Sequence, residues 1–190
     1  MPPIMIIRHA EKPLPGAAPR GVDADGMPDP ESLTPRGWQR AGALVGLFAG
    51  PRPAAVPVDL PTPTHLFASQ VGPRSSSRRP HQTLEPLSAR LGVGIDDRFL
   101  KEEIDRLCQA IRAIDGAVLV CWEHHLIPSI ATLLTGTTTG VPQIWPDDRF
   151  DVVWVIERGG DGTPTGLRQV PELLLAGDAP STIGDAPPVG

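Results

Sequence analysis

Short apolar runs alternate with amphipathic stretches along this chain. Ile4–Ile7 and Ala117–Trp122 are uninterrupted apolar runs, rich in β-branched residues, of the kind that is buried on both faces of a parallel sheet. Thr64–Ser69 also predicts a strand. Between these runs, apolar residues recur with helical spacing, which predicts helices that pack one face on the sheet.

The helix that follows the first strand has clear boundaries in the sequence. Thr34 is a good N-cap, Pro35 suits the first helical position, and Gly50 ends the apolar periodicity. Leu33 and Trp38 stand at the two positions of a hydrophobic staple. Further helices are expected within Ser75–Gly92, over Lys101–Ile114, and around Pro128.

The C-terminal part of the chain predicts two more strands. Phe150–Glu157 is strand-rich, Gly159–Gly162 is a turn signal, and Gly166–Val170 is expected to return as an antiparallel edge strand. The resulting order of elements predicts an α/β fold. We expect a three-layer α/β/α sandwich with a mostly parallel central sheet and a C-terminal antiparallel edge hairpin.

Proline and glycine mark the irregular segments of the chain. The 190 residues suit one domain, and the 24 prolines and 20 glycines gather in Pro13–Pro30, Gly50–Pro63 and Gly177–Gly190. The first two segments are long connections and are expected to shape the entrance to a site. We expect a domain over residues 1–176 and a loosely held Pro/Gly-rich tail over residues 177–190.

Charge and cysteine content limit the class of protein. A net charge of −5 argues against a general nucleic-acid binder. No apolar run is long enough to span a membrane, and the N-terminus lacks the pattern of a signal peptide. Cys108 and Cys121 lie in apolar segments and indicate reduced core residues. We therefore expect a cytoplasmic protein without nucleic-acid or membrane partners, and the sequence leaves its oligomeric state open.

Two of the apolar strands end in chemically active residues. Arg8-His9 follows the first strand, and His124 follows Ala117–Trp122. Ligands of open α/β sheets bind beyond the carboxyl ends of the strands, so these side chains are expected to converge. An arginine pair, Arg78-Arg79, is expected at a helix N-terminus, which adds free amide donors and partial positive charge.

Such a group of residues suits a phosphate. Guanidinium groups bind phosphate oxygens with paired hydrogen bonds, and helix N-termini add oriented amides. Phosphoryl transfer requires mainly positioning, charge neutralisation and an in-line nucleophile, and a histidine can serve as that nucleophile.

Four motifs, in order, resemble the histidine phosphatase superfamily in its phosphoglycerate mutase-like branch. Arg8–Glu11 resembles the family's Arg-His-Gly-Glu signature, and Leu33–Ala41 resembles its Leu-Thr-x-x-Gly-x-x-Gln-Ala helix start. Arg79–Thr83 resembles its Arg-Ala-x-Gln-Thr segment, and Val118–His124 resembles the strand that leads to its second catalytic histidine.

The resemblance implies a metal-independent phosphatase that hydrolyses a small phosphomonoester without a cofactor. It implies His9 as the nucleophile that forms a phosphohistidine, with Arg8, Arg79 and His124 completing a phosphate cradle. Arg79 is preferred because it stands three residues before Gln82, which leaves Arg78 as a rim cation. A non-catalytic phosphate-binding or interaction module on the same fold, or a phosphomutase, are the alternatives.

The sequence does not identify the proton donor for the leaving group. The family position points to Glu102 or Glu103, Glu123 is a third candidate, and a protein without such a donor is the fourth alternative. Ala10 replaces the family's glycine. His125 stands where histidine acid phosphatases carry an aspartate.

The remaining polar residues predict ordinary roles. The five histidines show no His-Glu-x-x-His motif and no cysteine cluster accompanies them, so no metal site is expected. His65 is expected at the surface start of a strand and His81 in the first turn of a helix. Glu11 is expected either to orient the phosphate loop or to face solvent. The tryptophans are expected in the core, with Trp145–Asp148 as a candidate pocket rim.

Overall fold

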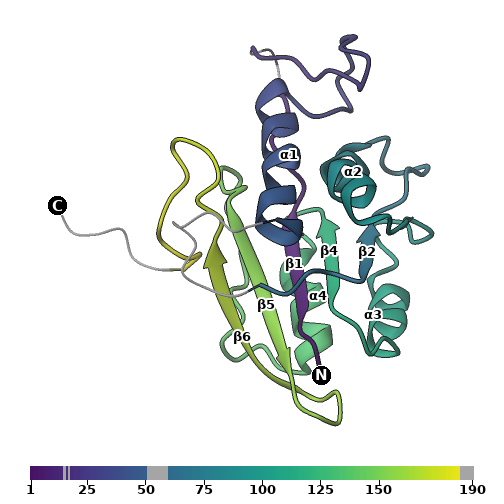
Figure 1. Ribbon diagram of the computed structural model, residues 1–190, viewed down its shortest axis with the longest axis vertical. Coiled ribbons are helices and arrows are strands. Elements are labelled where there is room, and N and C mark those ends of the chain that lie inside the picture. The colour runs from purple at the N-terminus through teal and green to yellow at the C-terminus, as the bar shows by residue number, and fades with distance from the viewer. Residues whose placement is uncertain (15, 17, 51–59, 185–190) are drawn as a thin grey trace, which may run out of the picture.

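The computed structural model describes residues 1–14, 16, 18–50 and 60–184, and the elements lie in that part of the chain (Figure 1). Most of the expected connection Gly50–Pro63 and the end of the expected tail lie outside the described residues. The strands are β1 (Ile4–Arg8), β2 (His65–Ala68), β3 (Ile95–Asp96), β4 (Val118–Trp122), β5 (Val152–Arg158) and β6 (Pro164–Pro171). The helices are α1 (Pro35–Ala49), α2 (Arg79–Leu91), α3 (Ile104–Arg112) and α4 (Ile127–Thr135).

The six strands form one mixed sheet in the order β3-β2-β4-β1-β5-β6. The pairs β3–β2, β2–β4 and β4–β1 are parallel, whereas β5 runs antiparallel to both β1 and β6. The expected parallel core with a C-terminal antiparallel hairpin is confirmed.

Helices cover both faces of this sheet, which explains why β1 is apolar up to Arg8 and β4 is apolar throughout. Every residue of these two strands is buried. Helices α1 and α2 pack on one face through a cluster that includes Leu44 and Leu84 (Figure 1). Helices α3 and α4 pack on the other through a cluster that includes Leu107 and Ile130. A strand with helices on both faces gains from apolar side chains at every position.

The start of α1 is fixed against the exit of β1. Thr34 is the N-cap, and its Oγ1 accepts a hydrogen bond from the amide of Gly37 at 3.2 Å. The Thr34 amide donates to the carbonyl of Glu11 at 3.0 Å. The predicted staple is confirmed, because Trp38 packs on the cluster that contains Leu33. These contacts hold the helix directly behind the segment that follows β1.

Helix α2 begins at the predicted arginine pair. Arg78 is its N-cap and Arg79 its first residue, and Pro86 is accommodated inside the helix. The helix ends at Gly92, whose φ of 67° places it in the left-handed region that glycine adopts without strain. The loop from β2 therefore brings Arg79 to the carboxyl edge of the sheet, where β1 and β4 also end.

Two local predictions differ from the structure. Helix α3 begins at Ile104 rather than at Lys101, because the Glu103 carboxylate accepts a hydrogen bond from the Leu100 amide at 2.9 Å and holds the preceding residues in a turn. Strand β3 was not expected. It consists of two residues that pair with Leu66 and Phe67, too few to produce an alternating pattern in the sequence.

The segment that follows β6 packs against the domain up to Ile183. The Ala179 amide donates to Asp151 at 2.7 Å, the Arg149 guanidinium donates to the Ser181 carbonyl at 2.8 Å, and Ile183 is buried. These contacts hold residues 178–183 more closely than a loose tail would be held. None of the helices in the described part of the chain has the length and apolar character needed to cross a membrane.

Candidate active site

The carboxyl ends of β1 and β4 lie side by side and deliver the first three candidate residues. The two strands pair in parallel with Arg8 opposite Trp122, and the His9 amide donates to the Trp122 carbonyl at 3.1 Å. His9 and His124 therefore leave the sheet at the same edge, on adjacent strands. The predicted proximity of Arg8, His9 and His124 rests on this register.

Arg8 is a buried cation with unused donors. Its Nη1 donates to the carbonyls of Pro146, Asp147 and Arg149 at 3.1, 2.7 and 2.9 Å, and its guanidinium carbon lies 3.8 Å from the centroid of the Phe150 ring. The buried Nε and Nη2 have no partner within the described residues. Burial lowers the pKa of Arg8 to about 10, so the group is still charged at neutral pH. Two buried N–H groups without acceptors indicate a place for an anion.

His9 is held as a neutral imidazole with a defined tautomer. Its Nδ1 lies 2.8 Å from the carbonyl oxygen of Ala10, which can only accept, so Nδ1 carries the hydrogen. Burial, with smaller contributions from Arg8, Arg79 and Lys12, lowers the pKa of His9 to about 3. The Nε2 atom consequently keeps its lone pair across the physiological pH range, which is the requirement for a nucleophile.

The residues that follow Arg79 brace the site. The Ala10 amide donates to Thr83 Oγ1 at 2.9 Å, and that hydroxyl donates to the Arg79 carbonyl at 2.7 Å. Gln82 accepts from the Leu33 amide at 3.0 Å and donates to the Ser32 hydroxyl at 2.7 Å. Gln82 and Thr83 thus connect the start of α2 with the segments that follow β1 and precede α1.

Arg79 lies among carbonyl groups of the loop before α1. Its guanidinium donates to the carbonyls of Pro30 and Ser32 at 2.7 and 3.4 Å and to the Ser77 hydroxyl at 3.2 Å, and burial lowers its pKa. Its side chain is 14% exposed, so it is not turned outward to solvent, whereas Arg78 is exposed.

Two cavities meet at Arg79. One of about 820 Å³ lies against the loop of residues 13–30, and one of about 460 Å³ is also lined by Glu123. The loop rich in proline that was expected to shape the entrance therefore lines a cavity beside Arg79.

His124 contacts an aspartate from the loop between α4 and β5. Its Nε2 lies 2.5 Å from Asp147 Oδ1, and its buried Nδ1 has no partner within the described residues. Burial and the Arg8 charge lower the pKa of His124 to about 4, and the contact with His124 lowers the pKa of Asp147. The same loop supplies the carbonyls that bind Arg8, so the segment Trp145–Asp148 contacts two of the candidate residues, while Trp145 itself is buried in the core.

Several solved structures match this fold over most of their length. The protein histidine phosphatase SixA in complex with tungstate matches 90% of this chain and 97% of its own length, with 18% identity and a TM-score of 0.54. A phosphoserine phosphatase from Entamoeba histolytica, in complex with 3-phosphoglyceric acid, matches the same shares with 13% identity and a TM-score of 0.54. A mycobacterial glucosyl-3-phosphoglycerate phosphatase matches 88% and 96%, with 12% identity and a TM-score of 0.52.

All three are histidine phosphatases. The chain has the histidine phosphatase fold. The resemblance inferred from the four motifs is confirmed at the level of the fold. No family model matches the sequence, and no curated protein does.

The three candidate proton donors occupy different surroundings within the histidine phosphatase fold. Glu102 is exposed on the turn before α3. Glu103 accepts from the Leu100 amide and pairs with Arg106, which gives it a structural role. Glu123 directly follows β4, pairs with Lys101 at 3.3 Å and lines the smaller cavity with Arg79. Glu123 is the member of this trio that shares a cavity with a candidate phosphate ligand.

Glu11 belongs to a charged network behind the site. Its carboxylate pairs with Arg40 at 2.9 Å and with Arg36 at 3.2 Å. Arg40 is buried and also pairs with Glu172 and Asp178, at 2.9 and 2.7 Å. Of the two expectations, orientation of the loop after β1 fits this arrangement, because the network ties that loop to α1.

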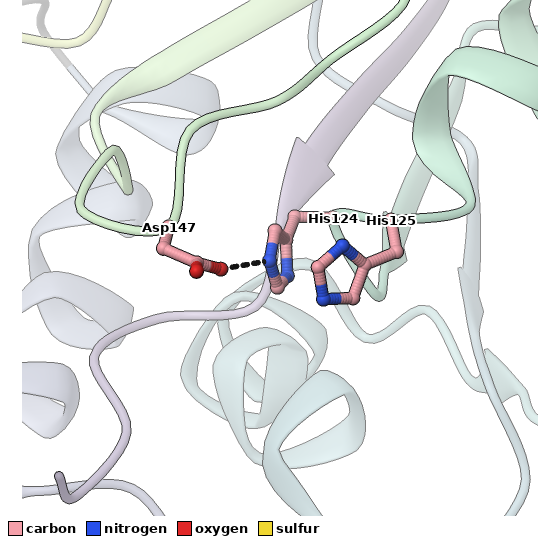
Figure 2. Close-up of side chains that lie close together, drawn as sticks. All are labelled: His124, His125 and Asp147. Atoms are coloured by element: carbon pink, nitrogen blue, oxygen red, sulfur yellow. Dashed lines mark hydrogen bonds and ion pairs between the residues drawn. The ribbon is translucent and has the colours of Figure 1, made fainter.

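The structure also brings together three side chains that can ligate a metal. Ring nitrogens of His124 and His125 and a carboxylate oxygen of Asp147 all lie within 4.8 Å of one another (Figure 2). Histidine spacing alone did not predict this cluster. The two histidines are adjacent in sequence, and the aspartate comes from a loop after the next helix, so the cluster has no motif.

Proposed function

We propose that this protein is a phosphatase that hydrolyses a small phosphomonoester through a phosphohistidine on His9. Arg8, Arg79 and His124 bind the transferred phosphoryl group. The reaction needs no metal ion, because the cradle supplies the positive charge itself.

One observation carries this proposal: a charged, buried arginine with two unused donors stands directly before a neutral, buried histidine. The arginine donors match the oxygens of a phosphoryl group. The histidine offers a lone pair at Nε2, because Nδ1–H is engaged by the Ala10 carbonyl. A site that only bound phosphate would gain nothing from a histidine kept neutral at this position, so we favour turnover over binding alone.

The chemistry proceeds in two displacements. In the first, His9 Nε2 attacks phosphorus, the bond from phosphorus to the leaving oxygen breaks, and that oxygen takes up a proton. In the second, water attacks phosphorus and passes a proton to the carboxylate that protonated the leaving oxygen. The bond from phosphorus to His9 Nε2 breaks, inorganic phosphate leaves, and the His9 lone pair is restored. Arg8, Arg79 and the helix α2 N-terminus neutralise charge on the phosphoryl oxygens in both displacements.

Glu123 is the proposed donor of the proton to the leaving oxygen. It follows β4 immediately and lines a cavity together with Arg79. A leaving group bound in that cavity would lie between the cradle and this carboxyl group. Lys101 pairs with the Glu123 carboxylate at 3.3 Å, so this ion pair has to break when Glu123 carries the proton.

The class of substrate follows from the size of the site and from the structural relatives. The cavities beside Arg79 are of the size that holds small molecules. Two relatives are named as phosphatases of small molecules, phosphoserine and glucosyl-3-phosphoglycerate. SixA is named as a protein histidine phosphatase and binds tungstate, an analogue of phosphate in shape and charge. We therefore propose a small phosphorylated molecule as substrate.

A phosphatase screen over many phosphoesters tests the proposal. The wild-type protein should hydrolyse at least one of them in the presence of a chelator, and quenched reactions should contain acid-labile phosphate on His9. His9→Ala should abolish both signals while its thermal unfolding remains cooperative. His81→Ala is the matched control, because His81 is a half-exposed histidine on α2 that pairs with Glu85. Tungstate binding without any turnover or phosphohistidine would instead favour a non-catalytic phosphate-binding module.

A further inference from the structure

His124, His125 and Asp147 form a compact set of metal-ligating atoms at the edge of the phosphate cradle. Figure 2 shows the imidazole of His124 between the other two side chains, with a hydrogen bond to Asp147. The centroids of the two imidazole rings lie 3.8 Å apart. His124 is buried, whereas His125 is exposed and the Asp147 side chain is 79% exposed. The cluster therefore extends from the buried phosphate cradle to the solvent-exposed surface.

The spacing of these atoms is close to that of a tetrahedral site. Zinc–nitrogen and zinc–oxygen bonds of about 2.1 Å place two ligand atoms about 3.4 Å apart. The contact of 2.5 Å between His124 and Asp147 must open slightly, and all three ligand atoms already lie within 4.8 Å of one another. The adjustment falls on the exposed Asp147 side chain, which can change rotamer without disturbing the core.

The polar atoms of the cluster also suit a metal ligand set. The Nδ1 atom of His124 is buried and has no hydrogen-bond partner within the described residues. The Asp147 side chain lies mostly in solvent and can turn toward a bound ion. The nearby charges of Arg8 and Lys12 oppose a cation, so the three ligands have to outweigh this repulsion.

We propose that His124, His125 and Asp147 bind a Zn²⁺ ion, and that this ion inhibits the enzyme. Two imidazoles and a carboxylate are a donor set that zinc accepts, with a water molecule at the fourth position. Mg²⁺ prefers oxygen ligands and retains its water, so it is not expected to bind. The ion would engage His124 and withdraw it from the phosphoryl group. This inhibition rests on the proposed function, whereas the binding of zinc does not.

Calorimetric titration of the chelator-treated, full-length protein with ZnCl₂ tests the binding. Wild type should bind one equivalent, and His125→Ala should weaken binding by more than about tenfold, since even residues that only support a ligand contribute that much. Asp147→Asn should weaken it similarly. His81→Ala, which removes a histidine from α2, should bind zinc as wild type does.

The proposal is overturned if zinc does not saturate wild type below about 1 mM, if His125→Ala binds zinc as tightly as wild type, or if Mg²⁺ binds equally well. His125 and Asp147 are exposed, so both variants should unfold at the wild-type temperature, which the same samples can verify.

A second measurement tests the inhibition. For each protein, the ratio of phosphatase rates with and without zinc is followed over the same range of concentrations. In wild type the midpoint should match the dissociation constant, and in His125→Ala it should move upward by the same factor as the binding. Zinc that binds at this site without slowing turnover would refute the inhibitory role. A protein that binds zinc as expected but hydrolyses no phosphoester would instead refute the proposed function.

Discussion

Gly37 offers a sharp test of how α1 is held against the exit of β1. It lies in the first turn of α1, and an added Cβ would stand 2.6 Å from the carbonyl oxygen of Glu11 and 3.1 Å from the Leu33 Cβ. Gly42 lies in the same helix, where an added Cβ would meet no atom within 4 Å. Alanine at these two positions therefore differs mainly in the contact with Glu11.

The expected change in the free energy of unfolding follows from these distances. Relief of the 2.6 Å contact requires the helix or the Glu11 segment to move by roughly 0.4 to 0.8 Å, and such overpacking costs about 1–3 kcal/mol. In a helix interior, alanine is favoured over glycine by about 1 kcal/mol. Gly42→Ala should therefore stabilise the protein by up to about 1 kcal/mol. Gly37→Ala should be less stable than Gly42→Ala by about 1–3 kcal/mol.

Urea unfolding of both variants and of wild type, followed by circular dichroism, measures these differences directly. For a chain of this size, each kcal/mol should also move the melting temperature by about 2–4 °C. Because Glu11 lies two residues from His9, Gly37→Ala should also lose phosphatase activity that Gly42→Ala keeps. Equal stability of the two variants would show that the loop after β1 moves away from the added methyl group without a cost in free energy, and would contradict the expected overpacking.

Three further perturbations address the site itself. Glu123→Gln should slow hydrolysis of alkyl phosphates by about 10²–10⁴-fold and that of p-nitrophenyl phosphate far less, as expected for loss of a general acid; equal losses on both substrates would contradict a donor role. Arg79→Lys should recover little of the activity lost in Arg79→Ala, because an ammonium group cannot reproduce the planar guanidinium contacts, and near-normal rates would contradict it. Burial lowers the pKa of His9 to about 3 in the folded protein, whereas an unfolded histidine has a pKa of about 6.5. Between pH 3 and pH 6.5 the unfolded state therefore binds one proton more than the folded state. The free energy of unfolding should fall as the pH drops from 6.5 toward 4, by up to about 1.4 kcal/mol per pH unit from His9. His9→Asn should show a shallower dependence in urea unfolding, and an unchanged slope would contradict the assignment.

Chain segments whose structure depends on local pattern were predictable. The apolar runs that became β1 and β4 were visible because helices cover both faces of these strands, so that no polar position interrupts them. The start of α1 was equally visible, since the N-cap, the proline and the staple are all local features. Strand β3 was missed because it consists of two residues that depend on the neighbouring strand β2.

The site residues also separate into those that could be predicted from local sequence and those that could not. The sequence alone determined that Arg8 and His9 would follow a buried strand, that His124 would follow another, and that Arg79 would begin a helix, because each placement depends on residues nearby in the chain. Only the tertiary structure decided that Asp147 meets His124, that the carbonyls of the same loop bind Arg8, and that His125 completes a metal-ligating set. These contacts join a loop to strand ends far from it in sequence. Their strength comes from burial, which holds both histidines neutral and leaves two arginine donors unpaired, and burial is a property of the assembled fold rather than of any segment.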